Sequence, residues 1–245
     1  MRSRACDAGT PLMTTKQIQI VMRDMLFITW AVDPDVARKL VDPRLELDTR
    51  IDSTGREAAY VSAVAFRVTD LQTGAMLMPS LAFEQINYRV YVKADDVPAV
   101  CFLGVRVNSR MVTALTSFMT LPVQYEDIGI STGPGNVGQL RYSIQSAGFR
   151  ADTIVGEPDA GAGSDSEITP AFITHRLFGY VAAGDGMFKI EVEQPGLVPV
   201  FASVQSVTAP ILKQFGVLTD QSARPHSALY VRDALFGTNT PTRFR

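Results

Sequence analysis

The sequence predicts a mainly β (α+β) fold, an antiparallel sandwich or barrel with a few flanking helices. Three observations support this fold class: short runs of β-branched and aromatic residues recur, turn signals separate them about every 8–15 residues, and few segments show a helical pattern. The 245 residues fit one large domain, since such folds often reach about 200–250 residues. We expect a single domain over residues 15–245 after a flexible leader at 1–14, in which Met13 is an alternative start to Met1.

The first predicted strand covers residues 24–32, an apolar run that ends at Asp33-Pro34. A run bounded by charge and proline is typical of a buried strand. Asp33 can cap a short helix that starts at Pro34, because proline lacks the N–H that would be unpaired in the first turn. We therefore expect a strand followed directly by a short helix, which Pro43 ends.

The next two strands are predicted at residues 58–69 and 83–93, joined by a loop at 70–80. Side chains alternate along 83–93, which separates two faces of the strand. One face is mostly apolar and carries Glu84, Ile86, Tyr88, Val90 and Val92, whereas the other carries Phe83, Gln85, Asn87, Arg89 and Tyr91. We expect the face with Glu84 to meet the core.

The rest of the chain continues this alternation of strands and turns. The remaining strands are predicted at 99–107, 140–149, 171–181 and 187–193, with one more near 228–231, and the remaining helices at 110–119 and about 201–215. Gly184-Asp185-Gly186 is typical of a hairpin turn. The glycine-, serine- and acid-rich stretch 156–167 predicts a flexible loop within the domain.

Composition excludes several classes of protein. A formal net charge of -2 without a basic stripe disfavours nucleic-acid binding. No apolar run approaches the roughly 20 residues of a membrane helix. Cys6 and Cys101 show no metal-ligand spacing, and the apolar run around Cys101 predicts a buried thiol. We expect a cytoplasmic protein that binds neither nucleic acid nor membrane.

Known catalytic motifs are absent from the sequence. It contains no phosphate-binding loop, dinucleotide fingerprint, zinc-protease motif or serine-hydrolase motif. The two histidines, His175 and His226, are isolated, which disfavours a metal site. We expect no metal and no cofactor.

Two residues are candidates for acid/base catalysis. His175 lies on a predicted strand, where a surface or pocket-wall residue is the more common interpretation, but its side chain has an ordinary pKa near neutrality that suits a general acid or base. Glu84 could lie on a solvated strand face, but its apolar neighbours on that face favour an acid/base role. An apolar environment raises the pKa of a carboxyl group and suits it to proton transfer.

Several segments resemble the acetoacetate decarboxylase family. Residues 23–33, 37–41 (ARKLV) and 45–48 (LELD) resemble the opening of the decarboxylase. Residues 83–92 (FEQINYRVYV) and the hairpin 172–194 resemble an uncharacterised branch of the same superfamily. The resemblance extends loosely over about residues 20–235, and the order of the motifs carries it.

The resemblance implies a closed cone-shaped β-barrel with a central pocket, and a homo-oligomer. In the decarboxylase a lysine pair follows the strand that corresponds to 99–107 and supplies a Schiff base. The matching residues 105–112 (VRVNSRMV) contain no lysine. Arginine cannot replace it, because its guanidinium stays protonated. Schiff-base decarboxylation is therefore disfavoured.

The resemblance also implies site residues for a small-molecule substrate. Arg23 matches a family arginine that faces the substrate, and Arg110, at the start of a predicted helix, could be a second anion contact. Asn87 and Arg89, together with Glu84, match the strand of the uncharacterised branch. Gln194 stands where that branch often has a histidine, which puts a role for that histidine in doubt.

The residues leave two functions open. The first is an enzyme, a lyase or cyclase, that acts on a small keto acid or polyketide-like carbonyl compound by proton transfer. Glu84 and His175 would be its catalytic residues, and Arg23, Asn87, Arg89 and Arg110 would bind the substrate. The second is a binding or regulatory domain that holds a small ligand in the same pocket without turnover.

Overall fold

A computed structural model describes residues 18–51, 55–73, 81–118, 122–156, 168–194, 196–221 and 223–244. The predicted leader at 1–14 and nearly all of the predicted flexible loop at 156–167 lie outside the described residues. In chain order the elements are β1 (Ile18–Val32), α1 (Pro34–Arg38), β2 (Glu46–Leu47), β3 (Arg50–Ile51), β4 (Glu57–Thr73), β5 (Phe83–Ala94), β6 (Val97–Val107), α2 (Arg110–Phe118), β7 (Val123–Tyr125), β8 (Gly129–Pro134), β9 (Leu140–Gln145), β10 (Arg150–Val155), α3 (Pro170–Thr174), β11 (Phe178–Ala183), β12 (Gly186–Glu193), β13 (Val200–Thr208), α4 (Pro210–Gln214), β14 (Ser227–Thr238) and β15 (Thr242–Phe244).

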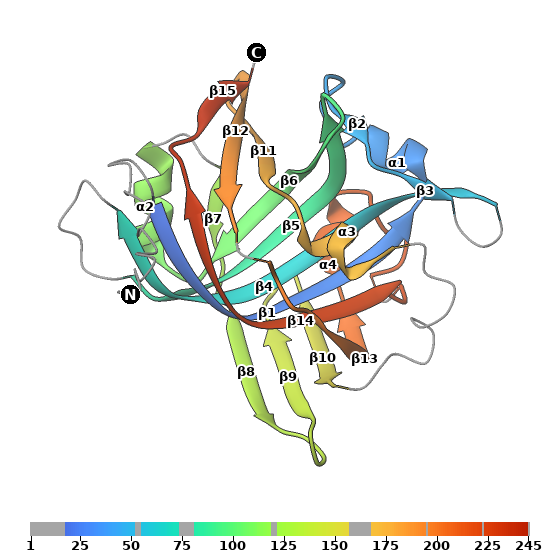
Figure 1. The fold of residues 1–245 in the computed structure, drawn as a ribbon, viewed down its shortest axis with the longest axis vertical. Helices are drawn as coiled ribbons and strands as arrows, with labels where there is room; N and C mark the ends of the chain where they lie inside the picture. Colours follow the sequence, from blue (N-terminus) through green and yellow to red (C-terminus); the bar gives the residue numbers. More distant parts are fainter. Residues whose placement is uncertain are drawn as a thin grey trace, which may run out of the picture.

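The predicted mainly β fold is confirmed, and its strands form a ring. Neighbouring strands follow the order β12–β11–β6–β5–β4–β1–β14, and β14 pairs back onto β12 at Val192↔Thr238 and Glu193↔Gly237. Most pairs are antiparallel, as expected, but β6 runs parallel to both β11 and β7. From β14 the sheet continues through β13, β10, β9 and β8. Figure 1 shows β8, β9 and β10 projecting beyond the ring.

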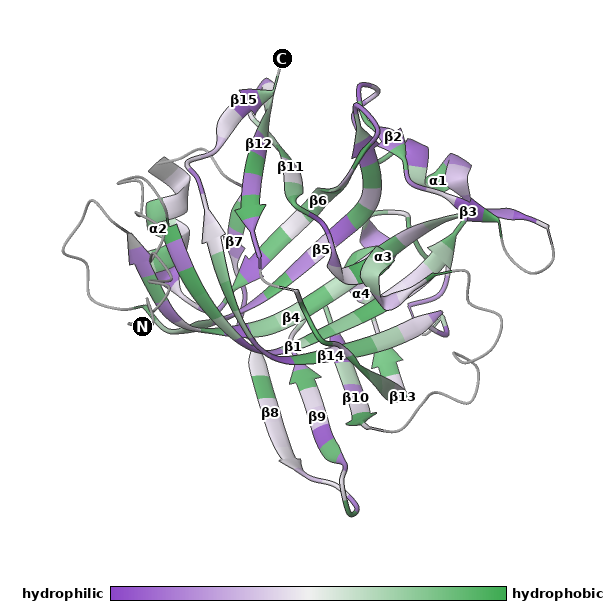
Figure 2. Cartoon of the chain, in the orientation of Figure 1, coloured by the Kyte–Doolittle hydropathy of each residue, from purple (hydrophilic) through white to green (hydrophobic). Residues whose placement is uncertain are grey.

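Two hydrophobic cores lie on opposite faces of the ring strands. Leu26 and Ile28 of β1 pack with residues of β9, β10 and α4, whereas Met25 and Phe27 pack with residues of α3 and β12. The strands β1 and β4 are correspondingly rich in hydrophobic residues (Figure 2). Both faces of these strands are therefore buried, and a polar side chain on either face must find a partner or line a cavity.

Local sequence signals explain where the short helices begin. The Asp33 side chain accepts a hydrogen bond from Asp35 N at 2.8 Å, which confirms the predicted cap of α1. The predicted strand at 171–181 is wrong in its first half. Thr169 caps α3, Pro170 occupies its first turn, and the strand β11 starts only at Phe178.

The predicted helix at about 201–215 is also wrong. Its first part is the strand β13, which is rich in the β-branched residues typical of strands, and only α4, which begins at Pro210, is helical. The prediction for Cys101 is confirmed: the residue is 4% exposed, and burial raises the pKa of its thiol to about 11. No described helix is long and apolar enough to cross a membrane.

Candidate functional site

A small cavity of about 100 Å³ lies inside the ring. Each strand of the ring contributes residues to its wall. We therefore call the face of each strand that lines the cavity its inner face, and the opposite face its outer face. The lining residues are Met22, Met25, Phe27, Val64, Phe66, Asn87, Arg89, Val100, Phe102, Thr174, Arg176, Phe178, Gly179, Val192, Gln194, Leu197 and Phe236. We refer to this cavity as the inner pocket. The described part of its wall is mostly apolar, and its charged members are two arginines.

Arg89 is a cation in the wall of the inner pocket and has no carboxylate partner within the described part of the chain. One terminal nitrogen, Nη2, donates to the Ile173 carbonyl oxygen at 2.8 Å and to the Tyr91 hydroxyl at 3.2 Å. The guanidinium carbon also lies 5.2 Å from the ring centroid of Phe27. Nε is buried and has no hydrogen-bond partner, and no acidic side chain of the described chain forms an ion pair with Arg89. A half-buried guanidinium with a buried, unpaired Nε and no acidic partner is suited to bind an anion.

A row of buried hydroxyl groups holds Arg89 in place. Ser62 lies directly opposite Arg89 on the neighbouring strand β4, and Thr29 lies opposite Ser62 on β1. The Ser62 hydroxyl is hydrogen-bonded to the Thr29 hydroxyl and to the Tyr91 hydroxyl, both at 2.7 Å. Because Tyr91 in turn accepts from Arg89, this row orients the guanidinium within the pocket.

Arg176, the second charged residue of the wall, is neutralised. Its side chain is only 2% exposed, and Nη1 lies 2.6 Å from the Asp48 carboxylate. Burial lowers the pKa of Arg176, and the hydrogen bond and charge of Asp48 oppose that shift. Asp48 also pairs with Arg50 at 2.7 Å and with Lys93 at 3.8 Å. Among the described lining residues, Arg89 therefore carries the positive charge that no carboxylate compensates.

Of the six predicted site residues, the structure places Asn87 and Arg89 in the inner pocket. Glu84 lies on the opposite face of β5. It shares that face with the buried residues Ile86 and Tyr88, which belong to the hydrophobic core on the outer side of the ring, the outer core. Its carboxylate accepts hydrogen bonds from Ile130 N at 3.1 Å and from Arg67 Nε at 3.3 Å. The apolar face was correctly identified, but the pocket is not on that face. The prediction of Glu84 as the acid/base therefore loses its geometric basis.

Glu84→Gln is expected to lower the free energy of unfolding by about 1–3 kcal/mol, because it removes the charge that pairs with a partly buried arginine. Ligand binding in the inner pocket should stay within twofold of the wild-type protein. Urea unfolding and a ligand titration on the same samples measure the two effects. A variant of wild-type stability that no longer bound ligand would restore Glu84 to the site.

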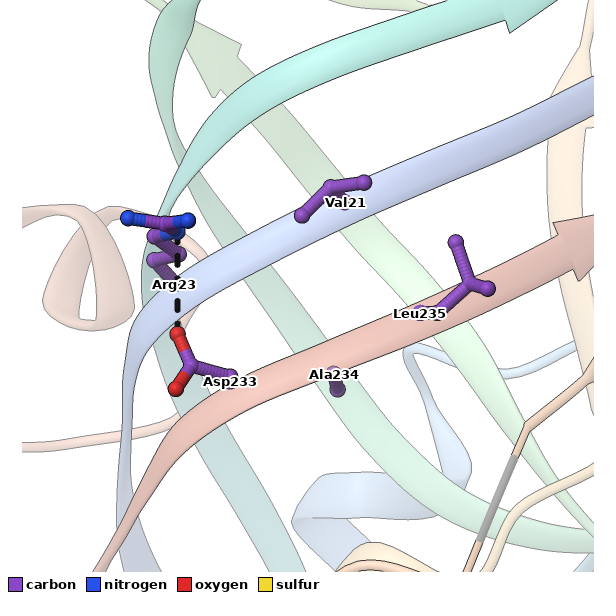
Figure 3. A pocket seen from close by; sticks show the side chains of 5 residues that line it. All are labelled: Val21, Arg23, Asp233, Ala234 and Leu235. Carbon is purple, nitrogen blue, oxygen red and sulfur yellow. Dashed lines mark ion pairs between the residues drawn. The ribbon is translucent and has the colours of Figure 1, made fainter.

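Arg23 lies outside the inner pocket. It is exposed and borders a shallow surface depression of about 390 Å³ between β1 and β14, together with Val21 and Leu235. Figure 3 shows its side chain beside that of Asp233 on the neighbouring strand, with 3.6 Å between Nε and Oδ1. Both side chains of this pair are 59% exposed, so it is a surface ion pair.

Arg110 and His175 are also outside the inner pocket. Arg110 is exposed at the first position of α2, with its guanidinium carbon 4.5 Å from the ring centroid of Tyr125. His175 is exposed at the end of α3, although its neighbours Thr174 and Arg176 line the pocket. Sequence reasoning selected the histidine for its chemistry and missed Arg176, because no local pattern marks the ion pair with Asp48, 128 residues away.

No lysine is among the described residues that line the inner pocket. Lys93 pairs with Asp48, and Lys189 lies over the ring of Phe178, with Nζ 3.9 Å from the ring centroid. Within the part of the chain that the structure describes, no group of three or more histidine, cysteine, aspartate or glutamate side chains is placed to hold a metal ion. The described wall thus offers a cation, amides and apolar side chains.

Comparisons with known proteins place this chain in a family and a fold. The DUF2071 family, described as an uncharacterized conserved protein, matches residues 20–232. The uncharacterized protein YqjF of Bacillus subtilis (strain 168) is 33% identical over 110 residues, which is 43% of this chain and 43% of that protein. The match thus spans less than half of that relative.

Three solved structures share the fold at low sequence identity. The acetoacetate decarboxylase of Legionella pneumophila is 10% identical, with a TM-score of 0.61 over 97% of this chain and 92% of that chain. An acetoacetate decarboxylase-like enzyme of Sphingomonas wittichii RW1 is 12% identical, with a TM-score of 0.58 over 99% of both chains. The enduracididine biosynthesis enzyme MppR, complexed with pyruvate, is 14% identical, with a TM-score of 0.59 over 95% of this chain and 91% of that chain.

Proposed function

We propose a function for this chain from two facts: it belongs to the DUF2071 family, and it has the fold of the acetoacetate decarboxylase-like enzymes. The inner pocket binds a small oxo acid, and Arg89 binds its carboxylate. The chemistry that follows does not use a Schiff base. One observation carries this proposal, namely a half-buried guanidinium in the pocket wall, with a buried and unpaired Nε and without an acidic partner among the described residues.

The partial burial of Arg89 in an apolar wall makes an anion the favoured ligand for this site. In a region of low polarity a charge is costly unless an opposite charge lies close to it. A ligand carboxylate would supply that charge to Arg89 and would give its free Nε an acceptor. Asp48 already neutralises Arg176, so that residue does not need the ligand in the same way.

A relative with the same fold supports the oxo-acid class. MppR has been solved in complex with pyruvate and with the condensation product of pyruvate and imidazole 4-carboxaldehyde. In this chain Asn87 lines the pocket beside Arg89, and its Oδ1 accepts a hydrogen bond from Gln85 at 2.6 Å. The amide N–H groups of Asn87 therefore remain to bind the oxo oxygen and to polarise the carbonyl group of the ligand.

Calorimetric titration tests the binding step. Pyruvate is expected to bind saturably, whereas pyruvamide, which has the same shape but no charge, should bind at least tenfold more weakly. The reason is that only the carboxylate forms a charge-assisted pair with Arg89. Equal affinities for the two compounds would contradict the proposal.

Borohydride reduction tests the absence of a Schiff base. No covalent adduct is expected when the protein is incubated with pyruvate or acetoacetate and sodium borohydride, because no lysine lines the described part of the pocket. Intact-protein mass spectrometry measures the result, and a Schiff-base decarboxylase serves as the positive control. A stoichiometric mass increase would show that a lysine reaches the ligand.

A second candidate function is a ligand-binding domain without turnover. The observation in its favour is that no carboxylate or imidazole side chain is among the described lining residues, so the wall lacks an ordinary general base. Exchange of the ligand's α-protons in D₂O, followed by NMR, separates the two functions. An enzyme that forms an enolate accelerates the exchange, whereas a binding domain leaves it at the rate in buffer. The homo-oligomer and the cytoplasmic location stay predictions.

A further inference from the structure

Phe102 lies directly beside Arg89 in the inner pocket. The two residues are cross-strand partners in the pairing of β5 with β6. The register shifts between Tyr88, which pairs with Gly104, and Arg89, which pairs with Phe102, so Leu103 is an extra residue on β6. Such a bulge re-aims the side chains around it. Here Phe102 lines the pocket while Leu103 packs against the outer core.

The Phe102 ring occupies the space that a side chain at position 179 would fill. A Cβ atom added to Gly179 would lie 2.5 Å from Phe102 Cε2 and 3.3 Å from Cζ. Real Cβ atoms do not approach a ring so closely, so any other residue at 179 would displace the ring. Gly179 and Phe102 both line the pocket, and the ring therefore fills space that a ligand would otherwise occupy.

The cavity that remains is small. Its volume of about 100 Å³ lies well below the roughly 300–1,000 Å³ of ordinary small-molecule sites. A dry cavity of about 150 Å³ in another protein accommodates benzene, with six carbon atoms. A ligand with its carboxylate on Arg89 must also lie along the ring of Phe102, because cross-strand partners are about 5 Å apart.

We infer that Phe102, whose ring packs against Gly179, limits the chain length of the ligand and restricts it to oxo acids of about three or four carbons. This inference rests on the proposed function, since it takes Arg89 as the carboxylate contact. It makes Phe102 and Gly179 a specificity-determining pair. Arg89 decides that the ligand is an anion, and the pair decides how long its apolar end can be.

The test is a titration series of straight-chain 2-oxo acids, from pyruvate to 2-oxohexanoate. In the wild-type protein, 2-oxohexanoate is expected to bind at least tenfold more weakly than pyruvate. In Phe102→Ala the order reverses, and affinity rises about fourfold for each added methylene that the enlarged pocket buries. Phe102→Leu, which removes less volume and is less disruptive, should extend the accepted length by a smaller step. Leu103→Ala is the matched control, because it truncates the neighbouring residue on the outer face.

A second pair of variants tests the contact itself. Gly179→Ala should weaken pyruvate binding at least tenfold, because the new methyl group displaces the Phe102 ring. In the Phe102→Ala background the same substitution should change binding by less than twofold, since the ring is gone. Thermal unfolding of each variant confirms that the samples are folded.

Two results would overturn the inference in different ways. If pyruvate binds and pyruvamide does not, but the length limit is the same in Phe102→Ala and Phe102→Leu as in the wild type, then Phe102 does not set it and the proposed function stands. If the wild-type protein binds pyruvate and pyruvamide equally, the proposed function fails and the inference fails with it.

Discussion

Arg89→Met is expected to weaken pyruvate binding by about 30-fold or more, since truncating one partner of a buried charge pair costs about 2–5 kcal/mol. The methionine keeps much of the apolar stem but removes the charge and every N–H donor. Isothermal titration of the purified variant measures the loss. Affinity for pyruvamide should change little, because that compound makes no ion pair.

The stability of the same variant gives an independent readout. Arg89 is a half-buried cation with a buried, unpaired Nε and no acidic partner among the described residues, and such a group adds little to the stability of the folded state. We therefore expect Arg89→Met to lose no more than about 1 kcal/mol in the free energy of unfolding, the net value of an ordinary hydrogen bond. Stability that is retained while binding is lost is typical of a functional residue.

Two further variants complete the experiment. Arg243→Met is the matched control, because Arg243 is 61% exposed and pairs with an exposed aspartate. Arg89→Lys should bind with intermediate affinity, since an ammonium cannot present two parallel N–H groups to a carboxylate. Wild-type affinity in Arg89→Met would exclude Arg89 as the carboxylate contact.

Asp48→Asn is expected to lower the free energy of unfolding by about 3–5 kcal/mol, because it leaves the buried Arg176 without its counter-charge. Asp48 is 1% exposed and pairs with Arg176, Arg50 and Lys93, so the substitution disrupts three ion pairs at once. For a chain of this size the loss corresponds to a fall of about 6–20 °C in the unfolding midpoint. Differential scanning calorimetry measures it.

The double variant Asp48→Asn/Arg176→Met separates charge from packing. Removing the unpaired arginine should recover part of the lost stability, because an uncompensated buried charge costs more than an apolar side chain of similar length. An equal or greater loss in the double variant would show that Asp48 acts through Arg50 and Lys93 instead. Glu57→Gln, which changes an exposed carboxylate, is the control. It should leave the unfolding midpoint within about 1 °C of the wild-type value, since exposed polar contacts contribute little.

The sequence by itself determined which residues share a face of β5. Side chains alternate along a strand without a bulge, so Asn87 and Arg89 had to lie together, and Glu84 had to lie opposite them. The same local reading located the capped start of α1 and the absence of a lysine at residues 105–112. These features depend on neighbours in the chain, and a single sequence contains them.

Only the tertiary structure decided which of the two faces encloses the pocket. Alternation cannot distinguish them, because β8–β10 and β13 cover the outer face of the ring and make it as apolar as the inner one. The ion pair of Asp48 with Arg176 and the packing of the Phe102 ring against Gly179 likewise join residues far apart in the chain. Ring closure sets these distances, which is why Glu84 and Arg89 were both predicted in the pocket, although the pocket lies on the face of β5 that carries Asn87 and Arg89.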